Sequence, residues 1–299
     1  MQVRAGLELL TTTEAADYLR IKERKLYELV AQRQVPCTKV TGKWLFPRAD
    51  LDRWLLAGMA RPYGVIPANP PPIVGGSHDL LLQWALTQSR AGLAMLPEGS
   101  EVGYRRFLRG EVLAAAIHFH DVDDPGKDAN VEVVGQEVTL YDAVLIGFAT
   151  REHGMLVAAC NPMGLRSLPD AQLKKARLVV RPAGAGAQQL LAALLKGHGL
   201  NVSDCLVTGE APTDPDIAQM IRAGHGDWGI ATRAIANAAG LDFVPLGVEH
   251  FDLLLRQRDA FRPPLQKLLK LITGPIFAAR AIELGGLDVS AAGCVRWAP

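Results

Sequence analysis

A segment rich in proline and glycine divides the chain into a short head and a long body. Residues 58–76 show no helical periodicity and contain Pro62, Gly64, Pro67, Pro70, Pro71, Pro72, Gly75 and Gly76. Proline fixes φ and lacks an amide donor, so this composition favours extended backbone. We therefore predict a head at residues 1–57, a linker at 58–75 and a body at 76–299.

Charge is distributed unevenly between these parts. Residues 1–61 carry 11 Lys and Arg against 7 Asp and Glu, whereas the remainder carries 21 against 24. A basic head on a mildly acidic body places any nucleic-acid contact in the head. A solvated surface with no nucleic-acid partner could carry the same excess.

The composition is that of a globular chain, with 49% hydrophobic and 21% charged residues. No apolar run approaches the roughly 20 residues of a membrane helix, and the N-terminus lacks an apolar signal core. We expect a cytoplasmic protein that is not bound to membranes. Four widely spaced cysteines, Cys37, Cys160, Cys205 and Cys294, favour reduced structural thiols.

The head has the pattern of two short helices followed by a hairpin and a third helix. Thr12 or Thr13 can cap the first helix, and residues 22–32 form the second, with a buried apolar face. Alternating residues 35–40 and 43–46 flank Thr41-Gly42, which predicts a β-hairpin. Residues 48–55 complete the unit as a third helix.

The run Leu10–Leu55 resembles the excisionase-type, MerR-like winged helix-turn-helix family. It contains Leu10-Thr11, Glu14-Ala15-Ala16, Tyr18-Leu19, Lys39-Val40 and Trp44 with Phe46, followed by Asp50-Leu51 and Trp54-Leu55. Lys22 and Thr41 depart from the family's usual pattern. The resemblance implies binding to double-stranded promoter DNA, with a small domain for protein contact as the alternative. The residues expected at DNA are Lys22, Arg24, Lys25, Tyr27, Lys39 and Lys43.

The body alternates short apolar runs with helical patterns. Strands are predicted at 72–74, 92–96, 112–119, 144–148, 155–159 and 177–180, and helices at 79–89, 187–198, 217–224 and 231–240. This alternation favours an α/β fold with parallel strands in βαβ units. The body could form one large domain or two similar lobes.

Two strand-to-helix turns in the body are suited to binding an anion. The first contains Ser77 and His78, and the second runs from Arg181 through Gly184, Ala185, Gly186 and Ala187. Free amides at a helix start favour negative charge, and glycine lets backbone approach a ligand closely. Ser77 could equally be no more than a helix cap.

The wider pattern resembles a periplasmic-binding-protein-like sensor domain related to molybdate-binding proteins. It is carried by Gly110–His118, Arg151–Val157, Asn161-Pro162, Gly226–Ala231 and Glu249–Leu253, and spans roughly residues 73–285. The resemblance implies two α/β lobes of type II topology, a double-crossover hinge and a ligand cleft between the lobes.

The second turn departs from that family's pattern. Arg181 is kept, but Ala185 and Ala187 replace hydroxyl residues and Gln188 replaces an arginine. Fewer donors weaken the case for a doubly charged tetrahedral oxyanion. Molybdate or tungstate is the first expectation, and a small carboxylate such as formate is the second.

Other candidate sites are less specific. His118 and His120 alternate before Asp121, but the spacing offers no third ligand, so we expect no metal and place His118 at the ligand. Asp214, Asp216, Glu249 and Asp252 suit helix caps or surface turns.

No nucleophile elbow or phosphate loop is present. We expect a homodimeric, ligand-responsive regulator without a cofactor or enzymatic activity. The alternative is an enzyme acting on a small anion with an appended DNA-binding head.

Overall fold

The computed structural model describes residues 8–40, 42–57, 69–120 and 128–299. The chain separates into two compact units, Met1–Tyr63 and Gly64–Pro299, and each is described by itself. Thr41, most of the expected linker (58–68) and Asp121 lie outside the described residues.

The first unit is a winged helix-turn-helix. Its elements are β1 (Leu9–Leu10), α1 (Thr12–Tyr18), α2 (Glu23–Ala31), β2 (Thr38–Val40), β3 (Lys43–Pro47) and α3 (Arg48–Ala57). The strands form a sheet of order β1-β3-β2, in which β2 and β3 are the expected hairpin. Gly42 lies between them at φ +81°, a conformation that favours glycine. Ala15, Leu26, Val30, Phe46 and Leu51 belong to the core of this unit.

The cap of α1 differs from the expectation. Thr11, rather than Thr12 or Thr13, is the N-cap, and Glu14 completes a capping box. The threonine hydroxyl accepts from the amide of Glu14, whose carboxylate accepts from the amide of Thr11. This reciprocal pairing requires the acid three positions after the cap, a spacing that only Thr11 has.

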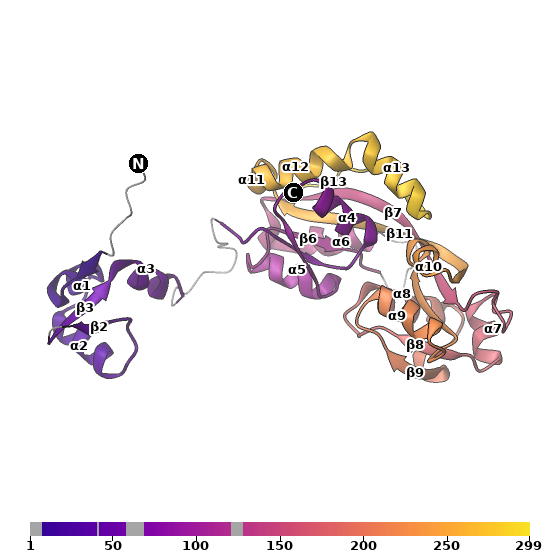
Figure 1. The fold of residues 1–299 in the computed structure, drawn as a ribbon, viewed down its shortest axis with the longest axis horizontal. Helices are drawn as coiled ribbons and strands as arrows, with labels where there is room; N and C mark the ends of the chain where they lie inside the picture. The colour runs from indigo at the N-terminus through magenta and orange to yellow at the C-terminus, as the bar shows by residue number, and fades with distance from the viewer. Residues whose placement is uncertain (1–7, 41, 58–68, 121–127) are drawn as a thin grey trace. The chain divides into compact units, whose positions relative to one another are not determined.

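The second unit is a two-lobed α/β domain. The first lobe contains a parallel sheet of order β5-β4-β6 with helices on both faces (Figure 1). Its N-terminal elements are β4 (Ile73–Gly76), α4 (Leu80–Gln88), β5 (Ala94–Pro97), α5 (Ser100–Leu108), β6 (Ala114–Ile117), α6 (Ala129–Gln136) and the 3₁₀ turn η1 (Val138–Leu140). The end of the chain returns to this lobe as α11 (Gln257–Ala260), α12 (Pro263–Ile272), α13 (Pro275–Leu284), β12 (Leu287–Asp288) and β13 (Val295–Trp297).

The second lobe is built from parallel strands in the order β10-β8-β9. Its elements are α7 (Leu168–Leu173), β8 (Arg177–Val180), α8 (Gly186–Gly197), η2 (Val202–Asp204), β9 (Leu206–Glu210), α9 (Asp214–Arg222), β10 (Trp228–Thr232) and α10 (Arg233–Ala239). Separate hydrophobic clusters lie around its sheet, one with α8 and Trp228 and the other with α9 and α10.

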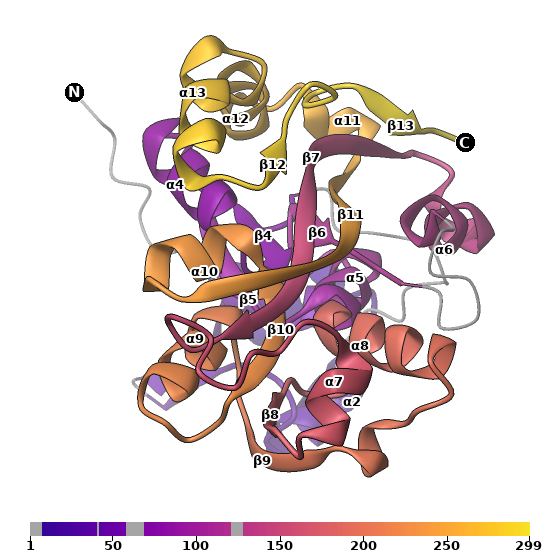
Figure 2. The same ribbon diagram turned by 90° about the vertical axis from the view of Figure 1, so that its right-hand side faces the viewer.

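Two long antiparallel strands connect the lobes. β7 (Ala143–Val157) and β11 (Asp242–Arg256) run side by side, as Figure 2 shows, and pair along almost their whole length. β11 pairs with β6 at one end, and β7 pairs with β10 at the other. The double-crossover hinge implied by the sequence is therefore present. Register shifts interrupt the pair at Pro245/Gly247 and at Phe251/Asp252, where bulges bend the strands.

The sequence-based element limits were wrong at this hinge. Residues 144–148 and 155–159 were expected as two strands, but residues 143–157 form the continuous β7. The intervening residues include the polar residues Arg151 and His153. Both are buried by neighbouring strands and by charge partners that the local sequence does not show.

Among the described residues, no helix combines the length and apolar character needed to span a bilayer.

Candidate functional site

The head presents its basic residues at the start of α2 and on the β2–β3 hairpin. Lys22 is the N-cap of α2 but makes no cap bond through its side chain. The Thr13 hydroxyl instead donates to the carboxylate of Glu23 at 2.5 Å, which joins α1 to α2. Lys22, Arg24, Lys25 and Tyr27 are all exposed, as a surface for DNA requires.

Neighbouring side chains contact some of these cations. Arg24 and Lys25 lie 3.6 and 3.3 Å from the carboxylate of Glu28, one turn further along α2. Lys39 lies over the ring of Trp44, with its Nζ 5.3 Å from the ring centroid. Such exposed ion pairs are weak, so the cations remain available to phosphate.

In the second unit, the two predicted turns lie at the boundary between the lobes. A Cβ on Gly186 would lie 2.3 Å from the imidazole of His118. A Cβ on Gly99 would lie 3.4 Å from the carbonyl oxygen of Gly184. These glycines therefore allow the β8–α8 turn of the second lobe to lie close to residues of the first lobe.

Ser77 and His118 belong to one buried network, with Ser100 between them. The hydroxyls of Ser77 and Ser100 are 2.8 Å apart. Ser100 Oγ accepts from the amide of His118 at 2.9 Å and donates to its carbonyl at 3.0 Å. Ser77 is not the cap of α4, because Asp79 is the N-cap and accepts from the amide of Leu82. His78 Nδ1 is buried and has no hydrogen-bond partner among the described residues.

Arg181 already has partners within its own lobe. Its Nη1 donates to the carbonyl of Ala211 at 2.9 Å, and its Nε lies 3.1 Å from the carboxylate of Asp214. Gln188, which stands where the related family has an arginine, accepts from the amide of Arg181 at 3.0 Å. The β8–α8 turn is therefore braced by side chains, although α8 begins after Ala185 without a side-chain cap.

The hinge strands place a buried charge cluster beside this network. Arg151 of β7 is directly opposite Glu249 of β11 and makes an ion pair with it. Arg151 also contacts the carboxylate of Asp79 at 2.9 Å, and its guanidinium lies 4.0 Å from the ring centroid of Phe251. Burial raises the pKa of Glu249, but the charge of Arg151 and the hydrogen bond with His120 outweigh burial and hold that pKa well below its usual range.

Three histidines surround Glu249. His120 Nε2 lies 2.8 Å from Glu249 Oε2, and His153 Nε2 lies 3.7 Å from the same atom. His118, His120 and Glu249 each offer a ligand atom, and these atoms all lie within 4.8 Å of one another. Burial lowers the pKa of His118 well below its usual range and also lowers that of His153, which favours the neutral form of both imidazoles.

The centre of this cluster was not predicted from the sequence. Glu249 and Asp252 were expected in caps or surface turns, but both lie in β11 and are 4% and 1% exposed. Asp214 is also buried, whereas Asp216 does complete a capping box with Thr213. Pairing with cations elsewhere in the chain permits burial of the two β11 carboxylates. The alternation of His118 and His120 was visible in the sequence, but Glu249 lies 129 residues beyond His120.

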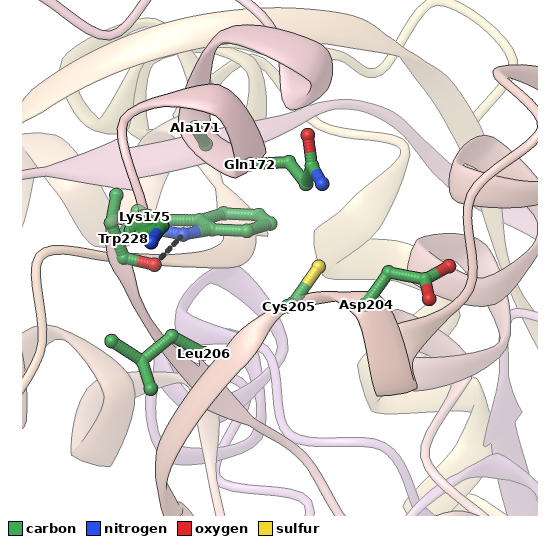
Figure 3. A pocket seen from close by; sticks show the side chains of 8 residues that line it. Ala171, Gln172, Lys175, Asp204, Cys205, Leu206 and Trp228 are labelled. Carbon is green, nitrogen blue, oxygen red and sulfur yellow. Dashed lines mark hydrogen bonds between the residues drawn. The ribbon is translucent and has the colours of Figure 1, made fainter.

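A separate pocket of about 310 Å³ lies in the second lobe. Trp228 forms part of its wall and donates from Nε1 to the carbonyl of Ala176, while Cys205 and Asp204 lie across from it (Figure 3). Burial raises the pKa of the Cys205 thiol. None of the residues lining this pocket was expected at the ligand from the sequence.

Comparison with known proteins agrees with this architecture. Residues 9–59 match the model of a helix-turn-helix domain, and residues 83–273 match that of the PBP superfamily domain. The protein YvgK of Bacillus subtilis (strain 168) is 22% identical over 301 residues, covering 95% of this chain and 96% of its own.

Two solved structures also match this chain. A cysteine-to-serine mutant of Corynebacterium glutamicum OxyR with bound H2O2 matches with a TM-score of 0.50 at 14% identity, covering 92% of this chain and 89% of that one. An ABC-type phosphate transport receptor from Vibrio cholerae matches with a TM-score of 0.44 at 13% identity, covering 71% and 97% of the two chains. By the match over residues 83–273, this chain belongs to the family of proteins with a PBP superfamily domain, here joined to an N-terminal helix-turn-helix.

Proposed function

We propose that the protein is a cytoplasmic, homodimeric transcriptional regulator that binds promoter DNA through its head and senses a small anion between the lobes of its body. The pairing of a helix-turn-helix domain with a PBP-like domain supports a ligand-responsive regulator rather than an enzyme. Two identical heads suit a pair of DNA half-sites related by two-fold symmetry.

One observation supports an anion site in particular. Two helices that begin without side-chain caps have their N-termini close together at the boundary between the lobes. Gly99 precedes α5 and Ala185 precedes α8, and neither N-cap makes a side-chain hydrogen bond. Gly99 lies against the carbonyl of Gly184, so the two starts are close together. Free amides at helix starts attract anions, and an anion held by both lobes would favour their closed arrangement.

The anion that we propose first is molybdate or tungstate, and the second is a small carboxylate such as formate. Ser77, His78, His118, Arg181 and the backbone of residues 184–187 are the proposed contacts. Arg181 should contribute most, because a charge-assisted hydrogen bond is worth about 1.5–3 kcal/mol.

The test is a set of anion titrations of the full chain, followed by thermal unfolding and calorimetry. We expect molybdate or tungstate to raise the melting temperature, as selective binding to the folded state requires. Arg181→Ala should weaken binding at least tenfold, and Ser77→Ala somewhat less. The anion should be recovered unchanged after incubation.

Asp214→Asn is the matched control for Arg181→Ala, since it breaks the same ion pair but leaves the arginine in place. If Arg181→Ala and Asp214→Asn weaken binding equally, the arginine only braces its own lobe. Unchanged affinity in Arg181→Ala would contradict the proposed anion geometry.

A further inference from the structure

We propose that His118, His120, His153 and Glu249 bind one divalent transition-metal ion at the junction of the two lobes. No metal is expected from the sequence, because no third ligand has a suitable spacing from His118 and His120. The fold supplies that ligand as Glu249, whose carboxylate lies with two of the imidazoles inside a 4.8 Å cluster.

His153 is a second, independent indication of a ligand. It is 1% exposed, and neither ring nitrogen has a hydrogen-bond partner among the described residues. Its Nε2 nevertheless lies 3.7 Å from Glu249 Oε2. An unpaired buried imidazole costs free energy, and coordination to a metal would satisfy one of its nitrogens.

The charge balance of the cluster favours a cation over an anion. Asp79 and Glu249 contribute two negative charges, and Arg151, in contact with both, contributes one positive charge. Asp79, Glu249 and Arg151 together therefore carry one excess negative charge, which a divalent cation would offset.

The donor types select the class of ion. Three imidazole nitrogens and one carboxylate oxygen suit Zn²⁺, Co²⁺, Ni²⁺ or Cu²⁺, whereas Mg²⁺ and Ca²⁺ prefer oxygen alone. The thiols of Cys160 and Cys294 are exposed and are not among the grouped ligand atoms. The site should therefore bind its ion without sulfur.

The position of the site links metal binding to the arrangement of the lobes. His118 and His120 follow β6 in the first lobe, Glu249 lies on the hinge strand β11, and His153 pairs with Thr232 of the second lobe. His118 also contacts Gly186 at the start of α8. An ion at this point would hold both lobes and would attract an anion at the adjoining helix starts. This regulatory consequence rests on the proposed function; the binding of the ion does not.

The experiment uses the full chain, freed of metal with a chelator and then titrated with Zn²⁺ or Co²⁺. We expect one ion per chain, and with Co²⁺ a visible d–d spectrum without a sulfur charge-transfer band. His120→Ala and Glu249→Gln should each lower the affinity by more than about tenfold, since even residues that only orient metal ligands have effects of that size.

His198→Ala and His250→Ala are matched controls, because both histidines are exposed and lie outside the cluster. They should bind the ion as the unaltered chain does. If Glu249→Gln does not fold, as judged by circular dichroism without metal, His153→Gln replaces it. Absence of stoichiometric binding, or equal losses in the cluster variants and controls, would overturn the proposal. So would a sulfur charge-transfer band with Co²⁺.

Adding double-stranded promoter DNA separates this inference from the proposed function. If the chain binds metal tightly but no ligand changes its affinity for promoter DNA, the metal site is supported and the proposed regulatory function is contradicted. An anion-dependent change in promoter affinity without metal binding would support the regulator and overturn the site.

Discussion

Gly186 lies where the two lobes contact each other, and there is no room for a Cβ atom at this position. It is the first residue of α8, and the Cβ of an alanine would lie 2.3 Å from the His118 ring and 2.4 Å from the His118 carbonyl. Both obstacles belong to a buried network, so neither can move as a flexible side chain would. The close approach of α8 to His118 therefore depends on the absence of a side chain at Gly186.

Gly186→Ala should lower the free energy of unfolding of the body by about 1–3 kcal/mol, the usual cost of overpacking, or else force the lobes apart. Gly197→Ala, at the other end of the same helix, should be neutral or stabilising by up to about 1 kcal/mol, because nothing lies within 4 Å of its Cβ. Urea unfolding of both variants measures this difference. Equal effects would contradict the closed contact between α8 and His118.

At the scale of elements, the head combines a recognition helix with a basic hairpin. Lys22, Arg24 and Lys25 lie over one exposed stretch at the start of α2, and the β2–β3 hairpin carries Lys39 and Lys43. A helix in the major groove reads base edges, whereas a wing chiefly contacts phosphate. The two elements should therefore contribute differently to sequence preference.

Lys43→Ala should weaken binding to all DNA sequences by a similar factor and reduce the magnitude of the log–log salt slope by roughly 0.9, the value of one phosphate contact. Arg24→Ala should instead change the preferred sequence. Fluorescence anisotropy over a range of salt concentrations measures both effects, with the body residue Lys270 changed to alanine as the control. If Lys43→Ala leaves the log–log salt slope unchanged, the hairpin does not contact DNA phosphate.

At the scale of the whole molecule, each of the two units has its own hydrophobic core. The head is built around Leu26, Phe46 and Leu51, whereas the body contains separate clusters in its two lobes. A unit that has its own hydrophobic core can unfold independently of the other unit.

We expect calorimetry of the full chain to show at least two transitions, one for the head and one or more for the body. A ligand of the body should raise only the melting temperature of the body, because stabilisation follows binding to the folded state of that unit. Duplex DNA should raise only that of the head. A single transition shifted equally by both additions would contradict independent units.

The sequence alone determined the features that depend on neighbouring residues. The acidic first turn of α1, the glycine of the hairpin turn and the periodicity of α2 and α8 act over a few positions, and they yielded the winged head and the alternating α/β body. Even here the predicted cap was one or two residues too late, although the spacing from Thr11 to Glu14 already marked Thr11 as the cap.

The tertiary structure alone decided the site. Arg151 and Glu249 are 98 residues apart in the sequence, and His120 and Glu249 are 129 residues apart. Arg151 meets Glu249 because β7 and β11 pair, and His120 meets it because β6, which ends shortly before His120, also pairs with β11. Local propensity fixes a few backbone angles at a time, whereas register is set by burying many side chains together, so only the folded sheet could bring these charges to one point.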